Sequence, residues 1–292
     1  MQGRVRWLIA VTVLVLALAA PVSAGVYYKS VTRGEGGPNA EMGNMVMKGW
    51  AEGEKARIEM VESNNPMTEA GTYFLTTDSG KLIYLVNPKE KTYSKWDMEA
   101  MVGAAGNAMK AARGFVSIKF SQPKVEKLLE ENGGTIVGLP TTHYRYRTSY
   151  SMEMKVMGMK QSSAVVNEEE IWSTSKLTAA VLGVWLKKEP PKFGDEQLDA
   201  LVKAEMGKVQ GIPLKTVTVS TTTDNKGKSQ VTKTTMEVVE FETVNVPDGK
   251  FVLDPSYKEV PMFPTEGAEG EEGEGDPSSA LMKMFGAKKK PN

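Results

Sequence analysis

The sequence predicts an α+β fold built on an antiparallel sheet of about ten or eleven strands, with a few helices between groups of strands. Apolar and polar residues alternate with a period of two along most of the chain, and short turn sequences separate these stretches. No part of the chain alternates strands with helices in the way that predicts a parallel sheet. Ala56–Glu62 has the clearest alternation, since charged and apolar side chains take turns along it.

Turn sequences divide the period-two stretches into individual strands. Thr77–Gly80 separates the β-rich runs Thr72–Thr76 and Lys81–Val86. Asn87–Glu90 turns the chain again, because Pro88 presets the backbone for a turn, and Lys91–Trp96 returns. A hairpin turn at Asp224–Gly227 joins two of the remaining strands, and Gly158–Ser163 joins two others. The remaining predicted strands are Val26–Val31, Met42–Gly49, Phe115–Phe120, Thr142–Met159, Ala164–Trp172, Thr216–Thr223 and Ser229–Phe241.

Helices are predicted where the apolar spacing changes to three and four residues. Asp97 is a helix N-cap residue for a segment that extends to Arg113, in which Gly103 and Gly106 each cost about 1 kcal/mol relative to alanine. Pro123 introduces a short predicted helix, Lys124–Glu131. The other two predicted helices are Lys176–Lys187 and one capped by Asp195 that ends near Gly207.

Both ends of the chain are predicted to lie outside the folded domain. Arg4 and Arg6 precede a short apolar run, Trp7–Ala20, and a small-residue cleavage site ends at Ala24, so residues 1–24 are predicted to be a signal peptide. An uncleaved membrane anchor is the alternative, disfavoured by the short run. Residues 265–292 begin with a Gly- and Glu-rich stretch that cannot bury a core, so we expect a disordered tail. Residues 25–264 form the predicted domain, located in the periplasm.

The composition argues against an enzyme. The chain has no Cys and a single His, His143, which removes thiol chemistry and most metal and acid–base chemistry. It also lacks the common nucleophile, phosphate-binding and dinucleotide-binding motifs. The 36 basic residues balance the 36 acidic ones, which gives no reason to expect nucleic acid as a partner. We therefore predict a non-catalytic protein without cofactor or metal.

Four segments of the chain have distinctive sequences. They are GWAEGEKARIE at Gly49–Glu59, KLIYLVNPKEKTYS at Lys81–Ser94, Gly211–Lys215, and VPDGKFVLDPSYKEV at Val246–Val260. Together they resemble the LolA/LppX-like superfamily of periplasmic lipoprotein and lipid carriers, within a branch of exported domains of unknown function. Ser256 stands where that family usually has Gly. The resemblance implies an antiparallel half-barrel whose concave, apolar face is covered by helices and holds acyl chains.

The methionines fit such a ligand site, because unbranched thioether side chains repack around ligands of variable shape. The chain has 18 of them, and many lie on predicted strands and on the first predicted helix. The predicted function is to bind an apolar ligand, such as a lipid or a lipoprotein acyl chain, as a monomer. The predicted ligand-binding residues are Ile58, Met60, Tyr84, Met98, Met101, Met109, Met152 and Met154.

Other interpretations of these residues stay open. The methionines also suit an ordinary core, in which case the chain is a packed structural or interaction domain with a cell-envelope protein partner. The Met-x-Met pairs at 45/47, 152/154 and 157/159 also suit Cu(I). His143 with Tyr144, Tyr146 and Tyr150 is a possible ligand cluster, although a lone strand histidine is more often structural. Arg145 and Arg147 are expected to pair across the hairpin with the two like-facing glutamates, Glu168 and Glu170.

Overall fold

A computed structural model describes residues 25–38, 40–65, 68–111, 116–156, 159–177, 190–208 and 210–261, and the structural statements below concern these residues. The predicted signal peptide 1–24 and the predicted tail 265–292 lie outside them, as does most of the predicted helix 176–187. No helix in the described part is long and apolar enough to cross a membrane.

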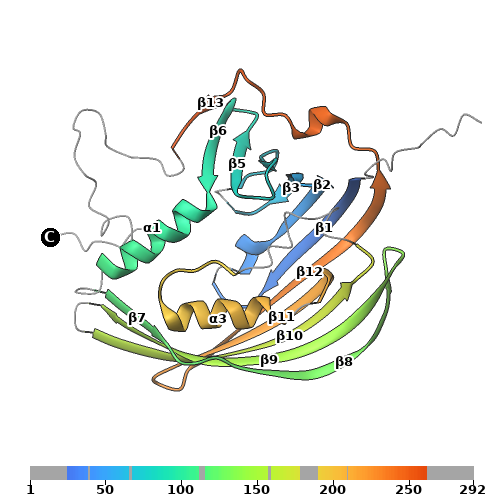
Figure 1. Ribbon diagram of the computed structural model, residues 1–292. Coiled ribbons are helices and arrows are strands. Elements are labelled where there is room, and N and C mark those ends of the chain that lie inside the picture. The colour runs from blue at the N-terminus through green and yellow to red at the C-terminus, as the bar shows by residue number, and fades with distance from the viewer. Residues whose placement is uncertain are drawn as a thin grey trace, which may run out of the picture.

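The fold is α+β, with one large, open and mostly antiparallel sheet (Figure 1). The sheet has 13 strands in the order β13-β6-β5-β4-β3-β2-β1-β12-β11-β10-β9-β7, and β8 also pairs with β9. Every pairing is antiparallel except that of β13 with β6. The predicted strands are all present, and β8 and β13 raise their number above the expected ten or eleven.

The sheet has a half of short strands and a half of long ones, which meet at β1 (Gly25–Glu35). The short-strand half consists of β2 (Met45–Glu52), β3 (Lys55–Ser63), β4 (Tyr73–Thr76), β5 (Leu82–Asn87) and β6 (Thr92–Asp97). The long-strand half consists of five strands of 13 to 18 residues and the short strand β7 (Val116–Phe120) at its edge. The five long strands are β8 (Lys124–Ile136), β9 (Leu139–Val156), β10 (Met159–Thr174), β11 (Ile212–Asp224) and β12 (Ser229–Val244). The remaining elements are η1 (Ala40–Gly43), α1 (Met98–Ala111), α3 (Glu196–Met206), η3 (Asp248–Phe251) and β13 (Lys258–Glu259).

Two sequence-based expectations in the long-strand half are wrong. The segment predicted as the helix Lys124–Glu131 is strand β8, which pairs along β9. Helix propensity favours a helix there by only tenths of a kcal/mol per residue, and the unpaired edge of an 18-residue strand outweighs it. The hairpin between β9 and β10 also turns before the predicted Gly158–Ser163 stretch ends, because Met159 already opposes Val156.

Residue pairing defines two faces of the sheet, because directly opposed residues of an antiparallel ladder lie on the same face. Following the opposed residues from strand to strand gives one row of residues from β3 to β12 and a second row from β12 to β9. The two rows share a face, because Val238 ends the first row on β12 and Met236, two residues away on the same strand, begins the second. The first row is Met60, Met47, Ser30 and Val238, and the second is Met236, Thr216, Ile171 and Tyr144. Figure 1 shows the sheet curving around α3. We call the face that α3 contacts the inner face and the opposite one the outer face.

The chain after β12 covers the outer face of the short-strand half. Val246 and Phe251 from this C-terminal segment are 4% exposed and join a cluster with Tyr73, Leu75 and Val86 of the sheet. The cluster also contacts partly buried side chains, among them Trp50, Tyr84, Tyr93, Leu253 and Tyr257. The segment ends as β13, alongside β6 at the edge of the sheet (Figure 1). The short-strand half is therefore packed on its outer face.

Candidate functional site

Four predicted ligand-binding residues lie on the inner face, although they come from strands far apart in the sequence. Ile58 and Met60 on β3 share a face with Met152 and Met154 on β9 through the rows described above. Ile58 and Met60 are buried, whereas Met152 and Met154 are half-buried. Phe120 and Ile118 of β7 stand opposite Met152 and Met154 and extend the same apolar surface.

Tyr84 lies on the outer face, so its grouping with Ile58 and Met60 is wrong. Tyr84 pairs with Leu75, and Leu75 pairs with Arg57, which alternates with Ile58 on β3. Its ring contacts that of Tyr93 at 5.8 Å and packs against the cluster under the C-terminal segment. Alternation identifies like-facing residues within one strand, but the lengths of two turns decide which residues of β3 and β5 share a face.

Helix α1 carries the remaining predicted ligand-binding residues. Met98 and Met101 are half-buried, and the side chain of Met109 lies outside the described part. The predicted cap is present, because the Asp97 carboxylate accepts a hydrogen bond from the Ala100 amide at 2.9 Å. Gly106, which was predicted only to weaken the helix, also contacts the chain just before α3. A Cβ atom at this position would lie 2.2 Å from the Phe193 carbonyl oxygen. Helix α1 and the approach to α3 therefore pack backbone to backbone.

A buried cation fastens the end of α3 to the inner face. The Lys208 side chain is 2% exposed, and its ammonium contacts the carboxylates of Glu169 on β10 at 2.6 Å and Glu205 on α3 at 2.5 Å. The Tyr146 hydroxyl donates to the Lys208 carbonyl at 2.6 Å, and the Ser173 hydroxyl donates to the Gln210 carbonyl at 2.7 Å. We call Lys208, Glu169, Glu205 and Tyr146 the Lys208 latch. The other end of α3 is capped as predicted, since Asp195 accepts from the Gln197 and Leu198 amides.

Polar groups beneath α3 are incompletely paired. Burial raises the pKa of the Tyr146 hydroxyl. Burial also raises the pKa of Tyr150, and the negative charge of Glu205 adds to this increase. The Thr148 hydroxyl and one Glu205 carboxylate oxygen are buried without a hydrogen-bond partner. Sequence reasoning missed this polar region, because a Glu and a Lys three residues apart at the end of a helix normally form a solvent-exposed pair.

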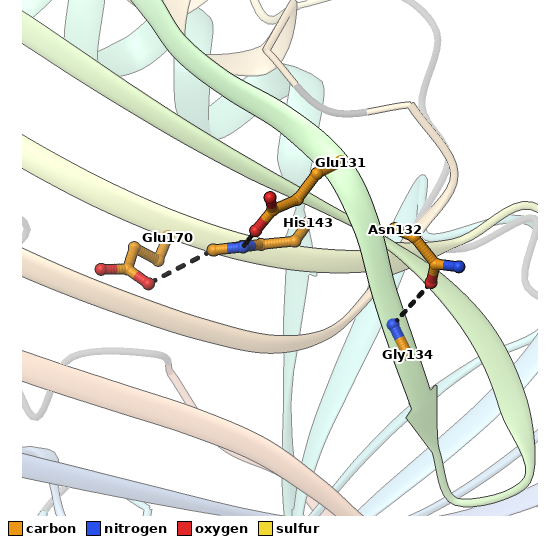
Figure 2. A network of polar contacts seen from close by, with 5 residues as sticks. All are labelled: Glu131, Asn132, Gly134, His143 and Glu170. Atoms are coloured by element: carbon orange, nitrogen blue, oxygen red, sulfur yellow. Dashed lines mark hydrogen bonds and ion pairs between the residues drawn. The ribbon is translucent and has the colours of Figure 1, made fainter.

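His143 lies on the outer face, where Figure 2 shows its ring between two glutamates. Its Nδ1 atom is 3.2 Å from Glu131 and its Nε2 atom is 3.2 Å from Glu170, and the ring stacks on Trp172 at 4.2 Å. Asn132, beside Glu131, accepts from the Gly134 amide in the same view. His143 therefore links β8, β9 and β10, and this role fits the interpretation of His143 as a structural residue.

The possible His–Tyr ligand cluster is wrong, because alternation along β9 places Tyr144, Tyr146 and Tyr150 on the opposite face from His143. In the described part of the chain, no group of three or more His, Asp or Glu residues could hold a metal ion. Of the expected cross-strand ion pairs, Arg147 contacts Glu168 at 2.6 Å. Arg145 stands opposite Glu170, but that carboxylate contacts His143.

Two surface hollows lie at the ends of strands. One, of about 310 Å³, is lined by the chain around Gly34–Pro38 and by β12. The other, of about 420 Å³, lies between the β9–β10 and β11–β12 hairpins and includes Met154, Met159 and Lys160 in its lining. Met154 is the one predicted ligand-binding residue that lines either hollow.

Comparison with known proteins adds little to this geometry. No protein-family model and no curated protein matches the chain. Among solved structures, the chain is similar to a "putative lipoprotein" from Parabacteroides distasonis ATCC 8503, with 10% sequence identity. The alignment covers 76% of this chain and 97% of that one with a TM-score of 0.25, so no shared fold is inferred.

Proposed function

We propose that this chain is a non-catalytic binding protein of the periplasm that holds an apolar ligand, such as the acyl chain of a lipid or lipoprotein, against the inner face and beneath its helices. In this proposal residues 1–24 direct export and are removed, and residues 25–264 form one half-barrel domain that acts as a monomer. The resemblance to LolA/LppX-like carriers supports the same function.

The observation that carries the proposal is the shared face of Ile58, Met60, Met152 and Met154. Six strand pairings separate β3 from β9, yet these flexible apolar side chains lie on the one face that α3 contacts. Surface methionines that are only half-buried, as Met152 and Met154 are, retain apolar area that a ligand can remove from water.

The test compares two neighbouring substitutions that add the same carboxylate to opposite faces of β9. Met152→Glu places it on the inner face, and Ser151→Glu, at an exposed position, places it on the outer face. Each protein is exported from a bacterial host and examined by native mass spectrometry and by titration with cis-parinaric acid, a fluorescent fatty acid. We expect unaltered protein and Ser151→Glu to carry lipid and bind the probe, and Met152→Glu to lose at least about tenfold in affinity.

Two results would contradict the carrier function. One is unaltered protein that carries no apolar mass and does not bind the probe, which would favour a packed interaction domain. The other is an equal loss of probe binding in Ser151→Glu, which would mean that added charge anywhere on β9 disturbs the protein. Far-ultraviolet circular dichroism checks that both variants keep their strand content.

A further inference from the structure

The charges at one end of the long-strand half differ from those on the rest of the outer face. Elsewhere most basic side chains on the strands meet a carboxylate, as Lys29 meets Glu240 at 2.9 Å and Lys95 meets Glu259 at 2.6 Å. At the end formed by β7 and the β9–β10 and β11–β12 hairpins, five exposed lysines accumulate. They are Lys119, Lys155, Lys160, Lys226 and Lys228.

The acidic residues at this end are already engaged. Glu153 contacts Lys160 at 2.6 Å. The hydrogen bond from Lys160, and after it the positive charges of Lys160, Lys119 and Lys155, hold the Glu153 pKa below its usual range. The Asp224 carboxylate accepts from the Lys226 and Lys228 amides at 2.8 and 2.9 Å within its own turn. Within the described residues, the ion pairs at this end therefore engage Lys160 and leave the other four lysines without a carboxylate within 4.0 Å.

Two of these lysines face each other directly. Lys155 on β9 is the cross-strand partner of Lys160 on β10, an arrangement that destabilises an antiparallel pair. Packing offers no reason for this choice, because both side chains are exposed. A surface that concentrates positive charge at a local cost in stability is suited to an external anion.

An exposed apolar side chain lies at the same end of the sheet but on the inner face, because Met159 opposes Val156 and alternates with Lys160. Met159 is 72% exposed, the highest value among the large apolar residues described. It lines the hollow of about 420 Å³ together with Lys160, the Asp224–Lys226 turn and Met154, which belongs to the inner face. The hollow thus joins the lysine-rich end of the sheet to the proposed ligand-binding face.

We propose that this surface, formed by the five lysines and Met159 and here called the tip surface, docks the protein on an anionic phospholipid membrane. Lysines attract the anionic head groups, and each lysine near such a surface contributes about 1 kcal/mol of binding free energy. Met159 enters the interface between the head groups and the acyl chains. Docking would bring the hollow, and Met154 behind it, against the membrane. The inference does not require the carrier function, because it rests on the charges and exposure of the tip surface alone.

The test measures co-sedimentation of the exported full chain with vesicles of phosphatidylcholine, alone or with one-third phosphatidylglycerol. We expect binding to the anionic vesicles that weakens at about 0.5 M NaCl, where exposed charges are screened. Lys155→Gln combined with Lys160→Gln should weaken it about 25-fold, since 1 kcal/mol is a factor of about five. Met159→Ser should weaken it about fivefold.

Lys81→Gln combined with Lys89→Gln is the matched control, because both lysines are exposed, lie on turns of the short-strand half and form no ion pair in the described part. This pair should retain binding. All proteins share the same termini, so differences between them report the tip surface. Equal binding to neutral and anionic vesicles, or an equal loss in the control pair, would overturn the inference. Protein that carries no lipid but shows tip-dependent docking would support it while contradicting the carrier function.

Discussion

Two segments cover the sheet, and they do so by different physical means. The C-terminal segment covers the outer face of the short-strand half largely through apolar side chains, with Val246 and Phe251 buried among Tyr73, Leu75 and Val86. Helix α3 buries Leu201, but its attachment to the inner face of the long-strand half depends on directional polar contacts at its end. Ion pairs such as Lys250–Glu59 at 3.5 Å add to the apolar burial of the C-terminal segment, whereas the end of α3 depends on the Lys208 latch.

This difference separates a permanent cover from one suited to release. The free energy of apolar burial is proportional to the buried area and is non-directional. Displacing part of the C-terminal segment would therefore expose apolar area and lower the stability in proportion. A latch of a few hydrogen bonds and ion pairs is lost over a small movement, and water can replace its partners. If a ligand enters beneath α3, the short-strand half supplies the stable frame and the latch supplies the movable end.

The largest expected effect is that of breaking the latch. Lys208→Met removes the ammonium and leaves the Glu169 and Glu205 carboxylates facing each other in a largely buried site, so the free energy of unfolding should fall by about 3 kcal/mol. Urea unfolding at neutral pH measures this change. Lys203→Met, at an exposed position on the same helix, is the control and should change the free energy by less than about 0.5 kcal/mol. Equal effects of the two substitutions would mean that the latch does not hold α3.

Features that depend on residues close in sequence were predictable. Residue type identified the Asp97 and Asp195 caps, and alternation identified the strands and the inner-face pairs Ile58/Met60 and Met152/Met154. It placed Tyr84 on the wrong face, because the relation between β3 and β5 depends on turn geometry rather than on periodicity.

The missed features depend on contacts between residues far apart in sequence. Lys208 is buried only because Glu169, 39 residues away, stands under the end of α3. The β8 segment has a helix-like sequence and becomes a strand because the long edge of β9 is available. No local pattern encodes either partner. Cross-strand ion pairs were partly predictable, because a hairpin fixes the register of its two strands. The pair of Arg147 and Glu168 is an example.

A smaller effect is expected where α1 meets the approach to α3. Gly106→Ala would place a Cβ atom 2.2 Å from the Phe193 carbonyl oxygen, and the backbone shift this requires should cost about 2 kcal/mol. Gly103→Ala on the same helix meets open space, so it should instead stabilise the protein by about 1 kcal/mol through helix propensity. Thermal unfolding of the two variants measures the difference. A gain in stability from both would show that α1 does not pack against the segment before α3.

The smallest effect compares one buried threonine from each half of the sheet. Thr76 in the short-strand half is fully engaged, because its hydroxyl donates to Asp78 at 2.9 Å and accepts from the Gly80 amide at 3.0 Å. The Thr148 hydroxyl, on the inner face near the latch, is buried without a partner. Valine has nearly the same shape as threonine, so substitution isolates the contribution of each hydroxyl.

Thr76→Val should lower the free energy of unfolding by about 1 kcal/mol, because it removes the hydrogen bond to Asp78 and the one from the Gly80 amide. Thr148→Val should raise it by about 1 kcal/mol, because it removes a buried polar group that has no partner to lose. Urea unfolding with and without cis-parinaric acid adds the functional readout. If Thr148→Val stabilises the protein and also weakens binding of the probe, the hydroxyl contributes to ligand binding at a cost to the stability of the fold. Destabilisation by Thr148→Val would mean that a bound water already satisfies this hydroxyl, so that Thr148, like Thr76, contributes a paired hydroxyl to the stability of the sheet.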